Sequence, residues 1–240
     1  MNQPQMRRRE WMLHCSACVA TLVAAGVLAG PVAAQGRTEG GAAPGASGAT
    51  GAAGAVPRRI VVLGDSLSAE YGLVRGSGWV ALLDQRLKAQ KLDAEVVNAS
   101  ISGDTTSGGR SRLPALLKQH RPTHLIIELG GNDALRGLPL KMTRENLKAM
   151  VQAGKEAGAK VLLVGMQIPP NMGASYARDF EGSFKTVAQE EKVPLQPFLL
   201  AGVADRPDMA DWFQGDRIHP LAKAHPVMLD NVWKVLRPML

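Results

Sequence analysis

Short aliphatic runs alternate along the chain with segments whose apolar residues recur at helical spacing. Five runs have the length and composition of buried strands, namely residues 60–63, 95–97, 125–127, 161–164 and 194–198. Between and after them, apolar residues at helical spacing occupy residues 79–87, 113–117, 147–151, 176–187 and 229–236. Apolar strands that alternate with helices predict an α/β fold with a parallel sheet covered on both faces.

Local signals predict where some of these helices begin and end. Thr143 is expected to cap the N-terminus of the helix that carries Leu147 and Met150, and Gly158 is expected to end it. The helix before it is expected to stop ahead of Arg121 and Pro122.

The first 57 residues have a different pattern. Three arginines at 7–9 precede an apolar stretch over 15–30 and small residues up to Ala34, which is typical of a secretory signal peptide cleaved after Ala34. Residues 35–57 consist largely of Gly, Ala, Ser and Thr and are expected to form a flexible linker. The folded domain is therefore predicted to span 58–240. An uncleaved anchor helix is the alternative for the apolar stretch, and the export route, Sec or twin-arginine, stays open.

Composition narrows the class of protein. The chain is 45% hydrophobic and 20% charged, as in ordinary globular proteins. Its net charge of +7 comes from scattered Lys and Arg, which does not indicate nucleic-acid binding. The two cysteines, Cys15 and Cys18, lie in the predicted signal peptide, so no disulfide is expected in the mature chain.

Polar clusters follow four of the predicted elements. Their ranges are 64–68 after the first strand, 102–104 after the second, 130–133 after the third, and 216–219 on a long loop after the fifth. Because the carboxyl ends of parallel strands meet at one edge of a sheet, these clusters are expected to converge there.

The four clusters contain the groups that acyl transfer needs. Ser66 can act as nucleophile, His219 as its base, and Asp216 as the group that orients the imidazole. The backbone N–H groups of Ser66 and Gly103 and the Asn132 amide can stabilise an oxyanion.

Each cluster also has a structural interpretation. The 64–68 segment resembles a turn or helix cap, the 130–133 segment resembles a turn, and Asp216 with His219 could be a surface pair or two metal ligands. Several other polar residues are expected to hold loops or to pack: Asp65, Asp104, Asp133, His120, His124 and His225.

Taken together, the ordered blocks resemble the SGNH (GDSL) hydrolase superfamily. The residues that carry the resemblance are Gly64-Asp65-Ser66-Leu67, Gly103, Gly130-x-Asn132-Asp133 and Asp216-x-x-His219. The chain is most similar to the bacterial secreted arylesterases and periplasmic acyl-CoA thioesterase/lysophospholipases. Two positions depart from the thioesterase pattern: Glu70 replaces a small residue, and Arg217 replaces a glycine.

The resemblance implies a flavodoxin-like three-layer α/β/α sandwich with a five-stranded parallel sheet in the order 2-1-3-4-5. It also implies a triad of Ser66, Asp216 and His219, with Ser66, Gly103 and Asn132 forming the oxyanion hole. The loop after the fourth strand lines the acyl groove in relatives, so Ile168, Pro169 and Met172 are weak candidates for substrate binding. Trp79 and Met166 are expected to belong to the core.

These inferences favour a secreted or periplasmic serine hydrolase of acyl esters or thioesters that needs no metal and no cofactor. A monomer is the default expectation for its assembly. No nucleic-acid partner and no stable membrane insertion after signal cleavage are expected. The alternatives are a carbohydrate O-acetylesterase with the same triad, and a non-catalytic binding protein on the same fold.

Overall fold

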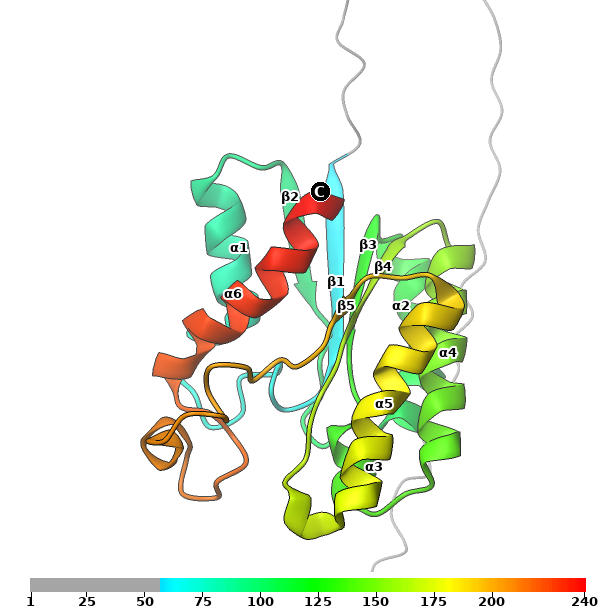
Figure 1. Ribbon diagram of the computed structural model, residues 1–240. Coiled ribbons are helices and arrows are strands. Elements are labelled where there is room, and N and C mark those ends of the chain that lie inside the picture. The colour runs from blue at the N-terminus through cyan, green and yellow to red at the C-terminus, as the bar shows by residue number, and fades with distance from the viewer. Residues whose placement is uncertain (1–56) are drawn as a thin grey trace, which may run out of the picture. The chain divides into compact units, whose positions relative to one another are not determined.

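Five parallel strands form one sheet in the order β2-β1-β3-β4-β5. The computed structural model describes residues 57–240 (Figure 1). The strands are β1 (Arg58–Gly64), β2 (Ala94–Asn98), β3 (His124–Glu128), β4 (Lys160–Val164) and β5 (Leu195–Gln196). The parallel sheet and its order are as predicted, which confirms the expected α/β class.

Helices cover both faces of the sheet. They are α1 (Trp79–Ala89), α2 (Thr106–His120), α3 (Gly131–Leu135), α4 (Leu140–Glu156), α5 (Ala174–Glu191) and α6 (His225–Leu236). Four short 3-10 helices accompany them: η1 (Pro170–Met172), η2 (Met209–Trp212), η3 (Ala222–Ala224) and η4 (Arg237–Met239). Helices α1 and α6 lie on one face, and α2, α4 and α5 lie on the other (Figure 1).

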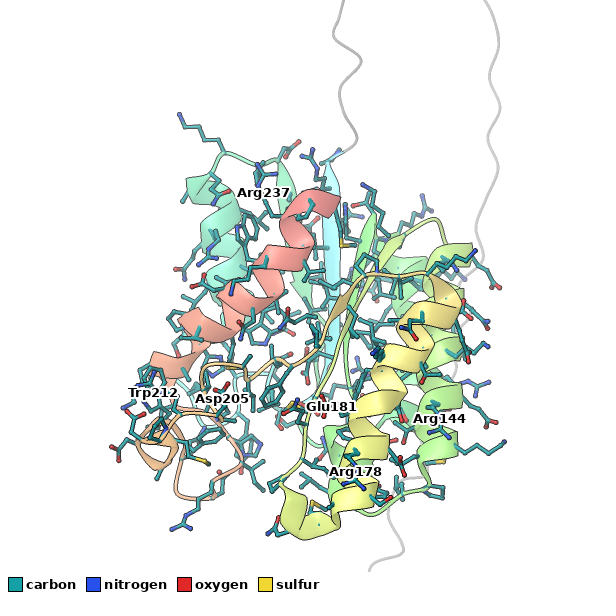
Figure 2. The ribbon with its side chains drawn as sticks, viewed as in Figure 1. Arg144, Arg178, Glu181, Asp205, Trp212 and Arg237 are labelled. Carbon is teal, nitrogen blue, oxygen red and sulfur yellow. The ribbon has the colours of Figure 1, made fainter. Side chains whose placement is uncertain are left out.

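Alternation along the strands divides the core into two layers. In β1, Ile60 and Val62 pack beneath α1 and α6, whereas Val61 and Leu63 pack toward α2, α4 and α5. Figure 2 shows side chains on both sides of the sheet, among them Arg144 of α4, which donates a hydrogen bond to Ser183 of α5 over 3.4 Å. Burial of apolar side chains on both faces explains why the strands are apolar nearly throughout.

The prediction that Thr143 caps a helix is wrong. Helix α4 begins one turn earlier, at Leu140, with Pro139 in the N-cap position. Thr143 is fully buried, and its hydroxyl donates a hydrogen bond to Asp133 Oδ1 over 3.2 Å. The Thr143 hydroxyl therefore forms a tertiary contact with the segment after β3. A pattern of neighbouring residues in the sequence cannot predict such a contact.

Two further elements differ from the sequence predictions. The segment that begins at Gly130 and Gly131 continues into the short helix α3, which differs from the alternative interpretation of residues 130–133 as a turn. The fifth strand is two residues long, shorter than the predicted 194–198, because only Leu195 and Gln196 pair with β4.

The predicted signal peptide (1–34) and all but the last residue of the predicted linker (35–57) lie outside the described residues. Within residues 57–240, the model contains no helix that is both long and apolar enough to cross a membrane.

His225 is buried at the start of α6 and joins it to α1. Its Nδ1 accepts a hydrogen bond from the Trp79 backbone N–H over 3.0 Å, so Nδ1 carries no proton and the imidazole is neutral. Burial lowers the pKa of His225 from 6.5 to about 4. Trp79 itself is fully buried, as predicted.

This burial predicts a loss of stability in acid. Between pH 6.5 and about 4 the unfolded chain binds a proton at His225 that the folded chain does not, so the free energy of unfolding falls as the pH is lowered. His225→Asn keeps an acceptor but cannot take the proton. The urea midpoint of the wild-type chain is therefore expected to fall more between pH 7.5 and 4.5 than that of the variant. His120→Asn is the matched control, and equal falls in the wild type and His225→Asn would contradict the account.

Candidate active site

Ser66 lies in a tight turn directly after β1. The Asp65 carbonyl accepts hydrogen bonds from the N–H groups of Ser68 (3.2 Å) and Ala69 (2.9 Å), and Asp65 Oδ1 accepts one from Leu67 N–H (3.0 Å). A Cβ atom on Gly64 would lie 2.7 Å from the Ser68 side chain, so the turn can pack this closely only with glycine at that position.

Ser66, His219 and Asp216 form one hydrogen-bonded chain. Ser66 Oγ lies 2.8 Å from His219 Nε2, and His219 Nδ1 lies 2.6 Å from Asp216 Oδ2. Asp216 Oδ1 accepts hydrogen bonds from the backbone N–H groups of Ile218 (2.9 Å) and His219 (3.0 Å). The hydrogen bond from the His219 side chain, followed by that from its backbone N–H, lowers the pKa of Asp216 to about 2. The carboxylate is therefore ionised at neutral pH.

The loop that carries Asp216 and His219 is held at its base. Phe213 and Pro220 form an antiparallel bridge, and Gln214 N–H donates to the His219 carbonyl over 2.7 Å. Gln214 Nε2 also donates to the Tyr71 carbonyl over 2.9 Å, which ties this loop to the segment after β1. The two halves of the triad thus come from segments that are bonded to each other.

The segment after the Ser66 turn is braced by a carboxylate. Glu70 has a left-handed backbone (φ 61°), and its side chain accepts hydrogen bonds from the N–H groups of Gly76 (3.0 Å) and Gly78 (2.8 Å). The neighbouring Tyr71 ring lies 4.3 Å from the His219 ring, centroid to centroid. Glu70, one of the departures from the thioesterase pattern, therefore holds the loop that supports the imidazole.

Hydrogen-bond donors from three segments meet at this edge of the sheet. Asn132 lies in α3, and its Nδ2 donates one hydrogen to Asp65 Oδ2 over 3.1 Å, which leaves the second amide hydrogen free. Gly103 has φ +78° and no side chain, and its carbonyl accepts a hydrogen bond from Arg136 over 2.9 Å. Among the described residues, the backbone N–H groups of Ser66 and Gly103 have no hydrogen-bond acceptor.

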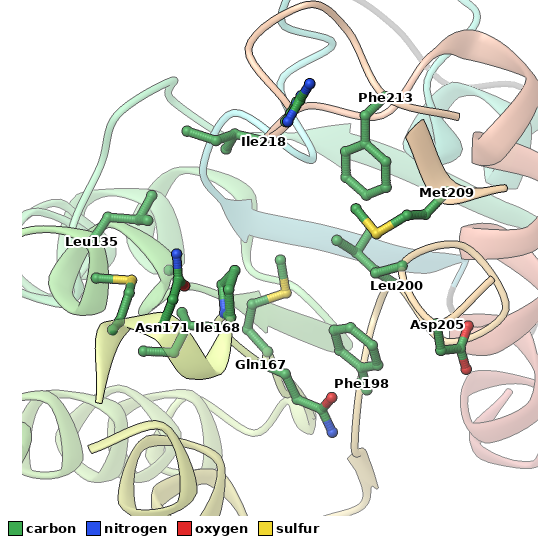
Figure 3. Close-up of a pocket in the computed structure, with 16 residues that line it drawn as sticks. Leu135, Gln167, Ile168, Asn171, Phe198, Leu200, Asp205, Met209, Phe213 and Ile218 are labelled. Carbon is green, nitrogen blue, oxygen red and sulfur yellow. The ribbon is translucent and has the colours of Figure 1, made fainter. Parts of the chain in front are cut away.

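A largely apolar cavity of about 570 Å³ opens beside these groups (Figure 3). All three residues predicted to bind substrate, Ile168, Pro169 and Met172, line it. Gly131, next to Asn132, also lines it, as do Arg217 and Ile218, which separate Asp216 from His219, so the cavity adjoins the residues that flank the site.

Some residues of the site differ from the sequence predictions or were absent from them. Met166, expected in the core, is half-buried and packs against both core layers, and it also forms part of the cavity wall. Glu128, at the end of β3, is buried behind the Ser66 turn and accepts a hydrogen bond from Ser68 Oγ over 2.7 Å. Its position at the carboxyl end of a central strand was the one available signal, because a single glutamate forms no motif.

The alternative of a metal site finds no ligand cluster in the part of the chain that the structure describes. No three His, Cys, Asp or Glu side chains there are arranged to hold a metal ion. Asp216 and His219 bond instead to each other.

Comparisons with known proteins agree with this fold and with the family resemblance of the sequence. The chain belongs to the GDSL-like lipase/acylhydrolase family, whose model matches residues 62–227. It is 48% identical over 186 residues to esterase TesA of Pseudomonas aeruginosa, an alignment that covers 78% of this chain and 91% of that esterase. It is 42% identical over 181 residues to thioesterase 1/protease 1/lysophospholipase L1 of Escherichia coli K12, covering 75% and 84% of the two chains.

Solved structures of relatives have the same fold. A crystal structure of TesA matches with a TM-score of 0.73 at 48% identity, over 76% of this chain and 100% of that chain. The esterase EstA from Pseudoalteromonas sp., inhibited by monoethylphosphonate, matches with a TM-score of 0.71 at 40% identity, over 76% and 98%. The family and these relatives make the chain a hydrolase of carboxylic esters or thioesters.

Proposed function

We propose that this hydrolase cleaves acyl esters and thioesters through a covalent acyl-enzyme on Ser66. The observation that carries the proposal is the continuous hydrogen-bonded chain from Ser66 Oγ through His219 to the ionised Asp216, next to an apolar cavity lined by the neighbouring Arg217 and Ile218. Nucleophile, base and orienting group thus lie within hydrogen-bonding distance before any substrate binds.

In the proposed reaction, His219 Nε2 takes the proton of Ser66 Oγ as that oxygen attacks the acyl carbon. Asp216 holds the Nδ1–H side of the ring and stabilises the imidazolium that forms. The negative charge that develops on the carbonyl oxygen is met by the N–H groups of Ser66 and Gly103 and by the free amide hydrogen of Asn132.

Collapse of this intermediate expels the alcohol or thiol, which receives the proton from His219. A water molecule, deprotonated by the same imidazole, then attacks the acyl-enzyme, releases the carboxylic acid and restores Ser66.

The proposed substrates carry acyl chains longer than acetyl. The cavity has the size and the apolar lining of sites that bind small organic ligands, and Leu135, Ile168 and Met172 offer it apolar surface. The names of the relatives, an esterase and a thioesterase/lysophospholipase, support both an oxygen and a sulfur leaving atom. No cofactor takes part in the proposed steps.

The proposal extends to location and assembly. The basic and apolar pattern of residues 1–34 supports export, so we place the mature protein in the periplasm or outside the cell. We propose that it acts as a monomer, since all groups of the proposed mechanism come from one chain.

A chain-length series tests the proposed function. Residues 35–240 are assayed on p-nitrophenyl esters from acetyl to palmitoyl, beside Ser66→Ala. Turnover is expected to peak at medium or long chains and to fall at least about 10⁴-fold in Ser66→Ala, because the nucleophile is lost. Turnover confined to acetyl would instead favour a carbohydrate O-acetylesterase, and full activity of Ser66→Ala would overturn the proposal.

Narrowing the cavity tests where the acyl chain lies. Met172→Trp places a large ring in the lining, so two or three methylene groups of a long chain lose their burial at about 0.8 kcal/mol each. The ratio of kcat/KM for decanoyl over acetyl esters is expected to fall about 10–50-fold. Val74→Trp, a change at an exposed residue that does not line the cavity, is the control. An unchanged ratio in Met172→Trp would place the chain elsewhere.

A further inference from the structure

Two carboxyl groups lie buried behind the Ser66 turn. Asp65 is 2% exposed and Glu128 is 3% exposed, and they follow or end the neighbouring strands β1 and β3, where Gly64 pairs with Glu128. The titratable groups that face Asp65 are His219, Asp104 and Glu128. Asp104 is in turn paired with Arg112 over 2.8 Å.

Asp65 bonds two parts of the site at once. Its Oδ1 accepts from the Leu67 N–H, which fixes the turn around Ser66, and its Oδ2 accepts from Asn132 Nδ2. Because a carboxylate only accepts hydrogen bonds, an ionised Asp65 requires the nitrogen of the Asn132 amide, and not its oxygen, to face the Ser66 turn.

Glu128 holds the other end of the same turn. Its Oε2 accepts from Ser68 Oγ over 2.7 Å and from the Asp65 N–H over 3.4 Å. Ser68 Oγ in turn accepts from Trp79 Nε1 over 3.2 Å, so this contact is anchored in the core.

Ionisation of both carboxyl groups at the same time is unfavourable, because burial disfavours ionised carboxylates and the two negative charges would repel each other. Burial, followed by the charge of Asp65, raises the pKa of Glu128 well above its ordinary value. Burial raises the pKa of Asp65 to about 6. Burial beside Asp65 therefore favours the form of the pair in which Glu128 keeps its proton and Asp65 carries the negative charge.

We propose that Asp65 and Glu128 act together as a positioning pair for the oxyanion hole. Ionised Asp65 aims the Asn132 amide at the reacting carbonyl oxygen, and uncharged Glu128 holds the Ser66 turn without adding a second negative charge behind the developing oxyanion. This inference rests on the proposed function, in which Asn132 is an oxyanion donor.

Asp65→Asn tests the first half of the pair. The new side chain keeps an acceptor for Leu67 but places an NH₂ group against Asn132 Nδ2, so the Asn132 amide turns away. The value of kcat is expected to fall about 100-fold, as for loss of one oxyanion donor, with KM changed less than about 3-fold. Asp84→Asn, which removes a partly exposed carboxylate paired with Lys88, is the control.

The double variant separates positioning from a merely structural effect. If Asp65 acts through Asn132, the two losses do not add. The kcat of the double variant Asp65→Asn/Asn132→Ala is then expected to lie within about 3-fold of the kcat of the slower single variant. A fall in kcat of the double variant equal to the product of the two single-variant falls would overturn the inference. Wild-type kcat in Asp65→Asn, with Ser66→Ala inactive, would overturn the positioning pair alone. Activity of Ser66→Ala would overturn the proposed function and the pair with it.

Glu128→Gln tests the second half without an activity assay. A folded pKa raised above the unfolded value of 4.5 makes stability fall as the pH rises beyond 4.5, because the folded chain must keep a proton that the unfolded chain releases. Glutamine has no proton to lose. The melting temperature of Glu128→Gln relative to wild type is therefore expected to increase from pH 5 to pH 8, and a constant or shrinking difference would overturn the assignment of the proton to Glu128.

Discussion

The position of β1 between β2 and β3 in a parallel sheet is the constraint on which the site depends. Because β2 and β3 both pair with β1, the segments that follow these three strands emerge side by side at one edge. Ser66, Gly103 and Asn132 stand on those three segments. The sheet therefore brings together the proposed nucleophile and hydrogen-bond donors that are far apart in the sequence.

The triad is completed by a loop that no strand fixes directly. The loop with Asp216 and His219 is positioned by the bridge between Phe213 and Pro220 and by the hydrogen bonds of Gln214. Its carboxylate stays ionised near the surface, where hydrogen bonds lower its pKa. The two carboxyl groups behind Ser66 have the opposite shift, because burial raises the pKa of both Asp65 and Glu128.

The same edge of the sheet thus holds carboxyl groups in two kinds of environment. In the proposed reaction, the exposed carboxylate of Asp216 supports the imidazole as it gains charge, and the buried pair supports the donors that meet the oxyanion. Different surroundings give chemically similar side chains different protonation states, and this allows them to serve different steps of one proposed reaction.

Most of the architecture was predictable because the strands and helices are locally consistent. The apolar runs of β1 to β4 and the helical spacing of α5 and α6 predict the elements, and the polar residues after the strands predict which groups converge. Tertiary contacts explain the failures. Thr143 bonds Asp133 and does not cap a helix, and Met166 packs against the core but also lines a cavity. Glu128 gains its role only from burial against Asp65, which no spacing encodes.

The central claim is a covalent intermediate on Ser66, and trapping it is the most direct measurement. The chain is mixed with a p-nitrophenyl ester, quenched in acid during the first turnover, digested and analysed by mass spectrometry. The account predicts an acyl group on the peptide that contains Ser66 and none on that peptide in Ser66→Ala. An acyl group on another residue, or rapid hydrolysis with no acylated peptide at any time, would contradict it.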